Sequence, residues 1–214
     1  RPEDDDTLVR RIVSGDRSAF ELLMRRHNRR LYRIARSVLR HSTEAEDALQ
    51  ESYLLAYQSL PQFRGDASVS TWLSRLVLNE CLGRLRRDNR RQNVVPIVSA
   101  PTELDSVADG ENVSPEHRAD RDRLRALVEA RLDELPRDFR IAFMLRSVEE
   151  LSVEEAAQVL GVPEATVRSR HFRAKSLLRE SLARELDVAE RDAFEFGGER
   201  CDRIVAGVLS RLAS

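Results

Sequence analysis

Several residue types that characterise other protein classes are scarce in this chain. Its 214 residues include eight glycines, seven prolines and two cysteines, and aromatic residues make up 5%. So few glycines and prolines argue against a turn-rich all-β fold. No apolar run approaches the roughly 20 residues that span a membrane. The first residues contain no apolar stretch after a basic flank, so we expect no secretory signal. The sequence predicts an all-α fold built from small helical units.

The residues that usually carry chemistry are also few and scattered. Cys81 and Cys201 have no second cysteine at metal-ligand spacing, and the four histidines are dispersed. A disulfide framework is therefore not expected, and a reducing cytosol fits this pattern. Glycine-rich dinucleotide motifs, phosphate loops and nucleophile elbows are missing. We expect no catalytic residue, no metal and no cofactor, so the chain is not predicted to be an enzyme.

Charge is arranged in blocks, although 36 basic and 37 acidic residues almost cancel. Residues 92–120 hold six acidic residues, one basic residue and no periodic pattern, which predicts a flexible acidic linker. Residues 84–91 and 161–184 each carry a net charge of +4. Two basic surfaces joined by an acidic tether indicate two contacts with one polyanion. The alternative is that these arginines simply cover solvated helix faces.

Apolar residues in the front half recur at helical spacing. The pattern from Phe20 to Val38 predicts an amphipathic helix that begins near Asp16 or Ser18. Residues 43–46 (TEAE) predict a capping box for a second helix, which Pro61 ends. A mixed apolar and acidic stripe on that helix suits a basic helical partner, although single exposed leucines are common. The stripe consists of Asp47, Gln50, Glu51 and Leu54.

A third helix follows the turn at Gly65 and Asp66, and Ser70 is expected to cap it. One face combines an aromatic ring, an amide and arginines, a set that can stack on single-stranded bases and bond to them. These residues are Trp72, Arg75, Asn79 and Arg86. The competing interpretation of Trp72 is a core anchor.

The back half contains a pattern typical of a helix-turn-helix. After a helix over residues 123–135, Ser152 and Glu155 predict a capping box, and Gly161 permits a positive φ at the helix exit. The second helix has the width of a DNA major groove. Its outward side carries Arg168, Ser169, Phe172, Arg173 and Ser176, and Lys175 and Arg179 are expected near phosphates.

Four segments stand in a characteristic order: 47–53 (DALQESY), 63–66 (FRGD), 71–79 (TWLSRLVLN) and 151–170. Together they resemble a bacterial sigma factor of the extracytoplasmic-function (ECF) group, over residues 7–91 and 121–183. The resemblance implies an alternative, stress-responsive sigma factor in the bacterial cytoplasm. Such a protein binds core RNA polymerase, directs it to a promoter and helps to melt the DNA. An anti-sigma factor is a further implied partner.

The resemblance also assigns roles to residues of this chain. The stripe Asp47, Gln50, Glu51 and Leu54 would bind the polymerase. The −10 element would contact Ala67, Ser68, Val69, Ser70, Trp72, Arg75 and Asn79, with Arg84, Arg86 and Arg87 on the backbone nearby. The −35 duplex would contact Arg168, Ser169, Phe172 and Arg173, with Lys175 and Arg179 close to them.

The implied organisation has four parts: sigma domain two (1–91), the acidic linker (92–120), sigma domain four (121–184) and a short helical C-terminal extension (185–214). The extension either caps the last domain or acts as a regulatory flap, and a redox role for Cys201 is the weaker idea. A stand-alone dimeric helix-turn-helix regulator, with a dimerisation or sensory front half, is the alternative function. A metal-dependent nucleic-acid enzyme lacks residues to complete its site.

Overall fold

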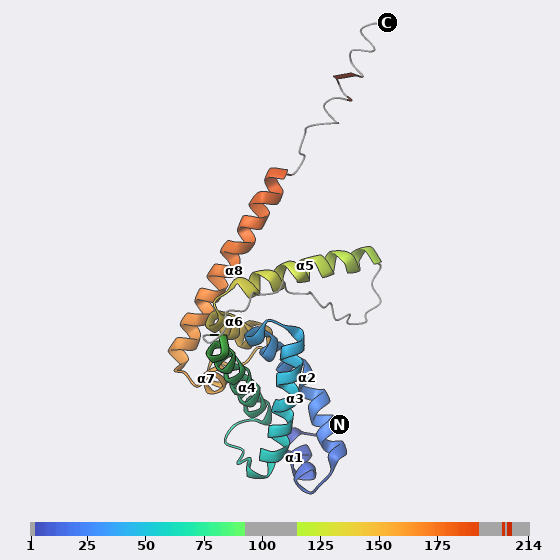
Figure 1. Cartoon of the computed structure of the whole chain (residues 1–214), viewed down its shortest axis with the longest axis vertical. Coiled ribbons are helices and arrows are strands. Elements are labelled where there is room, and N and C mark those ends of the chain that lie inside the picture. The colour runs from blue at the N-terminus through green and yellow to red at the C-terminus, as the bar shows by residue number, and fades with distance from the viewer. Residues whose placement is uncertain (1–2, 93–114, 193–202, 204, 207–214) are drawn as a thin grey trace. The chain divides into compact units, whose positions relative to one another are not determined.

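The computed structural model describes residues 3–92, 115–192, 203, 205 and 206, and within them every regular element is helical (Figure 1). This confirms the all-α class. The front region comprises α1 (Asp5–Val13), α2 (Arg17–Leu39), α3 (Ser42–Ser59) and α4 (Val69–Gln92). The following helices are α5 (Pro115–Glu134), α6 (Arg137–Phe143), α7 (Val153–Leu160) and α8 (Glu164–Asp192). A 3-10 turn covers Leu60–Gln62 and a π-helix covers Met144–Val148.

The chain divides into two compact units, residues 1–177 and 178–214. The first unit contains the front region and a back region, which we define as residues 115–177. Because α8 runs without interruption to Asp192, the expected boundary between residues 184 and 185 falls inside a helix. Most of the predicted extension, including Cys201, lies outside the described residues.

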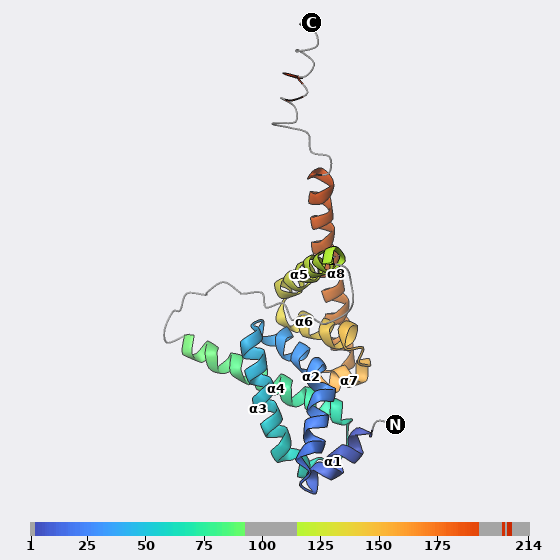
Figure 2. The same cartoon turned by 90° about the vertical axis from the view of Figure 1, so that its right-hand side faces the viewer.

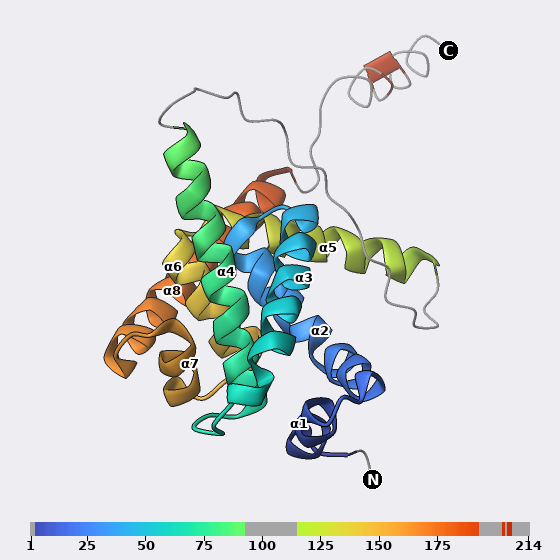
Figure 3. The same cartoon turned by 60° about the horizontal axis from the view of Figure 1, so that its bottom comes forward.

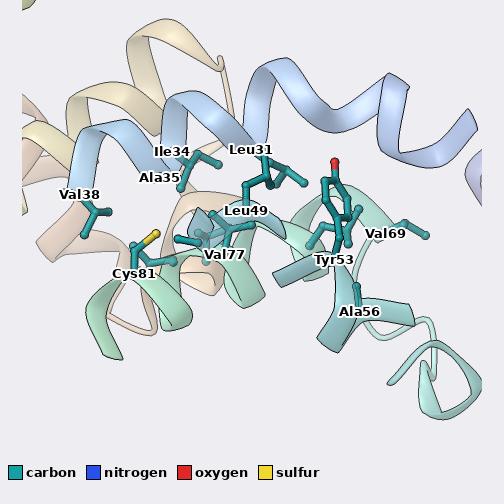
Figure 4. Close-up of a cluster of buried hydrophobic side chains, with 14 of the residues drawn as sticks. Leu31, Ile34, Ala35, Val38, Leu49, Tyr53, Ala56, Val69, Val77 and Cys81 are labelled. Atoms are coloured by element: carbon teal, nitrogen blue, oxygen red, sulfur yellow. The ribbon is translucent and has the colours of Figure 1, made fainter. Parts of the chain in front are cut away.

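Aliphatic side chains from α2, α3 and α4 form the centre of the front region. The three helices pack against one another, and Figure 3 shows α3 beside α4. Leu31 and Ile34 of α2 and Leu73 of α4 are almost completely buried, as is Cys81. Figure 4 shows this cluster, with Tyr53 of α3 among the aliphatic side chains. Burial raises the pKa of the Cys81 thiol to about 12, so this cysteine is not a reactive thiolate at neutral pH.

The start of α2 agrees with the sequence, whereas the start of α3 does not. Asp16 caps α2 by accepting hydrogen bonds from the backbone N–H groups of Ser18 and Ala19. The capping box predicted at Thr43 is wrong, because α3 already begins at Ser42 and its N-cap residue makes no side-chain cap bond. The left-handed residue Arg40 ends α2 so abruptly that Thr43 falls inside the first turn of α3.

The start of α4 also corrects an expectation. The Oγ of Ser68, not that of Ser70, accepts a hydrogen bond from the backbone N–H of Thr71 at 3.1 Å. Helix α4 begins one residue after Ser68, so Ser70 lies within its first turn. The hydroxyl of Ser70 is thereby available for another contact, with Arg30 of α2.

The predicted helix-turn-helix is present in the back region. Ser152 and Glu155 form the capping box of α7, in which the side chain of each residue accepts a hydrogen bond from the backbone N–H of the other. Gly161 has a φ of 64° at the end of that helix. The left-handed conformation costs glycine little, which explains the sharp turn into α8. One linker expectation fails: α5 begins at Pro115, so residues 115–120 are helical instead of lacking structure. Residues 93–114 lie outside the described part.

The back region packs against the front region within the first unit. Helix α6 and the π-helix contact α2, and α7 contacts α4 (Figure 2). One apolar cluster joins front residues such as Val77 to Leu151 and Val159 of the back region. Arg140 of α6 is 2% exposed and donates to the carbonyl oxygens of Ser37, Asp133 and Leu135. Burial lowers the pKa of Arg140 to about 10, which leaves it charged at neutral pH.

Candidate nucleic-acid interface

The stripe on α3 is exposed along its whole length. Asp47, Gln50, Glu51 and Leu54 all face solvent, and the Leu54 side chain is 59% exposed. The opposite face of α3 is buried against α2 and α4, which fixes the orientation of the stripe. Sequence reasoning missed Leu55, which is 43% exposed beside Leu54. An exposed apolar pair among carboxylates is a surface suited to a protein partner.

The segment predicted to contact the −10 element is divided between core and surface. Val69 is 2% exposed, so its side chain belongs to the core. Trp72 is half-buried against Phe63, with ring centroids 5.2 Å apart, so it serves partly as the core anchor considered above. Arg75 and Asn79 are exposed on α4. Ala67 and Ser70 are half-buried, and Ser68 is exposed.

Two of the three arginines of α4 that were predicted to contact the DNA backbone are paired with a carboxylate. Arg84 Nε and Arg87 Nη2 donate to the same Glu80 oxygen, at 2.9 and 3.0 Å. Arg84 also donates to the backbone oxygen of Asp47 at 3.1 Å, which ties α4 to α3. Arg86 is exposed. Any phosphate contact by Arg84 or Arg87 therefore competes with Glu80.

The start of α8 presents a polar face with one large aromatic ring. Val167 and Ala174 are fully buried and orient the helix. On the outward side Arg168, Ser169, Phe172, Arg173 and Lys175 are exposed, as is Arg179 further along. Phe172 is 76% exposed, the largest such value among the large hydrophobic residues described. Arg168 pairs with Glu164 at 2.5 Å.

His171 packs on the inner side of α8 and does not belong to its outward face. It is half-buried, and its Nε2 lies 2.7 Å from the Ser147 hydroxyl. Burial lowers the pKa of His171, and the nearby charges of Lys175 and Arg146 lower it further. The ring is therefore neutral at pH 7 and adds no charge to the outward face of α8.

An ionic contact between the two regions was missed by sequence reasoning. Arg30 and Arg33 of α2 bind the carboxylate of Glu149, and Arg36 binds that of Asp133. These arginines recur at steps of three residues, a spacing that places them along one helix face. Nothing in that spacing distinguishes arginines that bind a distant carboxylate from solvated ones.

In the part of the chain that the structure describes, no three His, Cys, Asp or Glu residues are placed to hold a metal ion. None of the described helices has the length and apolar character needed to cross a bilayer.

Comparison with known proteins explains both regions. The family model for Sigma-70 region 2 matches residues 23–91, and that for Sigma-70, region 4 matches residues 125–178. The RNA polymerase sigma-H factor of Pseudomonas aeruginosa is 35% identical over 185 residues, which cover 84% of this chain and 94% of the relative. The ECF RNA polymerase sigma factor SigM of Mycobacterium tuberculosis is 38% identical over 174 residues, covering 81% and 82%. The chain belongs to the ECF sigma factors. This sigma factor also shares its fold with RpoE of Bartonella quintana, solved in complex with the anti-sigma factor NepR; the TM-score is 0.64 at 22% identity, over 77% of this chain and 96% of that one.

Family membership decides between the functions that the sequence left open. The sigma factor is an alternative RNA polymerase sigma factor, because both expected regions match in the expected order. The front region matches Sigma-70 region 2, whereas a stand-alone regulator was predicted to carry a dimerisation or sensory domain there. Sigma factors are regulatory proteins, which agrees with the expectation of no catalytic site.

Proposed function

We propose that this sigma factor binds core RNA polymerase through the exposed stripe of α3 and reads a promoter with two separate DNA-binding surfaces. The stripe supports this role because Leu54 offers apolar area while Asp47 and Glu51 offer charge to a basic helical partner. Electrostatic complementarity of this kind speeds association and fixes the register of docking. The polymerase performs the chemistry, and the sigma factor itself acts by binding.

The −10 surface is proposed to centre on Asn79 and Arg75, which are exposed on α4 next to the 67–70 segment. Extracting one base from the stack costs about a few kcal/mol, which hydrogen bonds to the flipped base must offset. An exposed amide and guanidinium can supply those bonds. Val69 contributes through its backbone, since its side chain lies in the core, and Arg86 contacts the strand nearby.

The −35 surface is the start of α8, and its geometry is the observation that carries the proposal. Buried Val167 and Ala174 turn Arg168, Ser169, Phe172 and Arg173 outward together. A helix placed in the major groove reads bases with the side chains near its N-terminus. The exposed ring of Phe172 suits a thymine methyl group or a sugar, because an apolar contact of this kind distinguishes thymine.

The remaining assignments extend this proposal. The domains are taken as 1–91 and 121–184, joined by the acidic linker, with residues 185–214 as a cap or flap. An anti-sigma protein is the expected regulatory partner, supported by the complex in which a sigma factor of this fold was solved. Since polymerase and promoter are cytoplasmic in bacteria, the sigma factor is expected to act in the cytoplasm. It is expected to need no catalytic residue, because the polymerase performs the chemistry.

Run-off transcription with purified core polymerase and a library of promoters tests the proposal. The wild-type chain should confer initiation at defined start sites. Arg173→Ala should weaken −35 binding and relax sequence choice, by about 1–3 kcal/mol for a lost base contact. Asn79→Ala should impair strand opening, measured by permanganate reactivity, more than duplex binding. Failure of the wild-type chain to confer any defined start site would refute the proposal.

A further inference from the structure

The contact between the two regions concentrates on three arginines of α2. We define the arginine row as Arg30, Arg33 and Arg36. Arg30 Nε and Arg33 Nη1 lie 3.2 and 3.3 Å from the two carboxylate oxygens of Glu149. Arg36 binds the Asp133 carboxylate in a bidentate manner: Nη2 lies 3.0 Å from Oδ2, and Nη1 lies 3.3 Å from Oδ1. Each arginine in the row thus binds an acidic group supplied by the back region.

The carboxylate of Glu149 is held in place from several directions. Its side chain is 7% exposed, and its backbone oxygen accepts a further bond from Arg30 Nη2 at 3.2 Å. The next residue, Glu150, has a φ of 54°, a left-handed conformation unfavourable for a side chain other than glycine. A buried carboxylate is stable only when charged and hydrogen-bonded partners surround it. If the back region moves away, both Glu149 and the arginine row lose those partners.

The arginine row begins at the proposed −10 surface. Arg30 Nη1 donates to the Ser70 hydroxyl at 2.6 Å, within the 67–70 segment. The guanidinium group of Arg30 therefore touches both a residue of that surface and Glu149 of the back region. A strand seated beside Ser70 would therefore lie next to Arg30, the first arginine of the row.

Promoter reading and the observed contact exclude each other. Elements named −10 and −35 lie about 25 base pairs apart, which at about 3.4 Å per base pair is about 85 Å. Within the first unit, however, Glu149 of the back region touches α2. A sigma factor bound to both elements must therefore separate the two regions and free the arginine row.

We propose that Arg30, Arg33 and Arg36 are a phosphate-binding row for the melted promoter strand, and that Glu149 and Asp133 occupy it as competitors when the regions are in contact. Guanidinium groups bind phosphate and carboxylate in the same bidentate geometry. A phosphate can therefore replace a carboxylate without a change in the conformation of the site. The choice of a promoter strand as the ligand rests on the proposed function. The competition itself rests on the paired charges alone.

Binding of the full chain to a fluorescent single-stranded DNA of mixed sequence, measured by anisotropy across a salt series, tests this proposal. Glu149→Gln keeps the shape of the side chain and removes its charge, so it should tighten binding several-fold. Arg33→Gln should weaken binding and reduce the steepness of the slope of log K against log salt concentration by about 0.7. This is the value for one lost phosphate contact on a single strand. The double variant should lose the gain seen with Glu149→Gln.

Arg10→Gln is the matched control, since it removes the same charge from α1, where Arg10 bonds to Thr7. Asp133→Asn is a second variant that should also tighten binding, and thermal melting checks that each variant is folded. An unchanged affinity for both Glu149→Gln and Asp133→Asn, or an Arg33→Gln slope equal to that of Arg10→Gln, would overturn the proposal. Run-off transcription separates the two hypotheses: normal initiation with unchanged slopes refutes the arginine row alone, whereas altered slopes without initiation refute the proposed function alone.

Discussion

The front region of the sigma factor has a continuous interior of aliphatic side chains, whereas the back region has a smaller apolar centre and meets α2 largely through charged groups. Leu31, Ile34 and Leu73 are almost completely buried between three packed helices. At the contact between the regions lie Glu149, with its two arginines, and the buried Arg140. Exposing apolar area costs about 25 cal/mol per Å², whereas separated charges regain hydration. The ionic contacts of α2 with the back region should therefore separate more readily than the aliphatic interior of the front region, while the apolar packing of α7 on α4 opposes that separation.

The largest expected effect breaks the front region. Leu31→Ala removes a completely buried side chain of the cluster drawn in Figure 4 and should lower the free energy of unfolding by about 2–5 kcal/mol. Urea denaturation followed by circular dichroism measures this change. Leu54→Ala removes an exposed leucine and should stay within about 0.5 kcal/mol of the wild type. Similar losses for both variants would mean that the aliphatic interior does not set the stability.

The next effect concerns the contact between the regions. Arg140→Met should destabilise the chain by about 2 kcal/mol. Two buried carbonyl oxygens lose a donor at roughly 1–3 kcal/mol each, and the chain no longer has to bury the guanidinium charge, which offsets part of that sum. Arg137→Met is the control, since Arg137 is exposed one turn earlier in α6. Hydrogen exchange should accelerate at the end of α2 and in α6 while α3 stays protected. Equal acceleration in α3 would show that the two regions unfold as one body.

A smaller effect separates the two predicted capping boxes. Ser152→Ala removes the observed cap of α7 and should cost about 1 kcal/mol, with faster amide exchange in its first turn. Thr43→Ala should cost distinctly less, because Thr43 is not the N-cap residue of α3, and the N-cap residue, His41, makes no side-chain cap bond. Equal costs would place a functional cap at Thr43 after all.

The smallest effect is a pH dependence of the front region. Burial lowers the pKa of His27, and the charges of Arg30 and Arg26 lower it further. Asp5, whose carboxylate lies 2.9 Å from His27 Nε2, acts in the opposite direction but does not reverse the shift. The unfolded chain therefore binds a proton more readily than the folded chain. Stability is complete above the unfolded pKa near 6.5 and decreases as the pH falls toward the folded value. Urea titrations measure the loss of unfolding free energy between pH 7.5 and 5.5, and this loss should be smaller for His27→Gln than for the wild type. An identical loss in both would show that His27 is not the source of the pH dependence.

Local signals in the sequence predicted the helix-turn-helix well. Ser152, Glu155 and Gly161 act within a few residues of one another, so their spacing alone specifies the turn. The same reasoning failed at Thr43, because the left-handed Arg40 shortens the connection from α2 and shifts the start of α3. The contact of Arg30 with Glu149 joins residues 119 apart in sequence, and no local pattern predicts such a pair. The periodicity of the sequence predicted which face of α3 is exposed. The polymerase-binding role of that face came from the resemblance.

The separation of the two regions on a promoter tests the account most directly. Cysteines at the exposed positions Gln58 of α3 and Glu154 of α7, in a Cys201→Ser background with Cys81 buried, can carry a pair of distance probes. The distance between them should increase by tens of ångströms when the free chain enters a polymerase–promoter complex, since the −10 and −35 elements are about 85 Å apart. An unchanged distance in an initiating complex would contradict the account, because Glu149 would then remain on the arginine row during promoter binding.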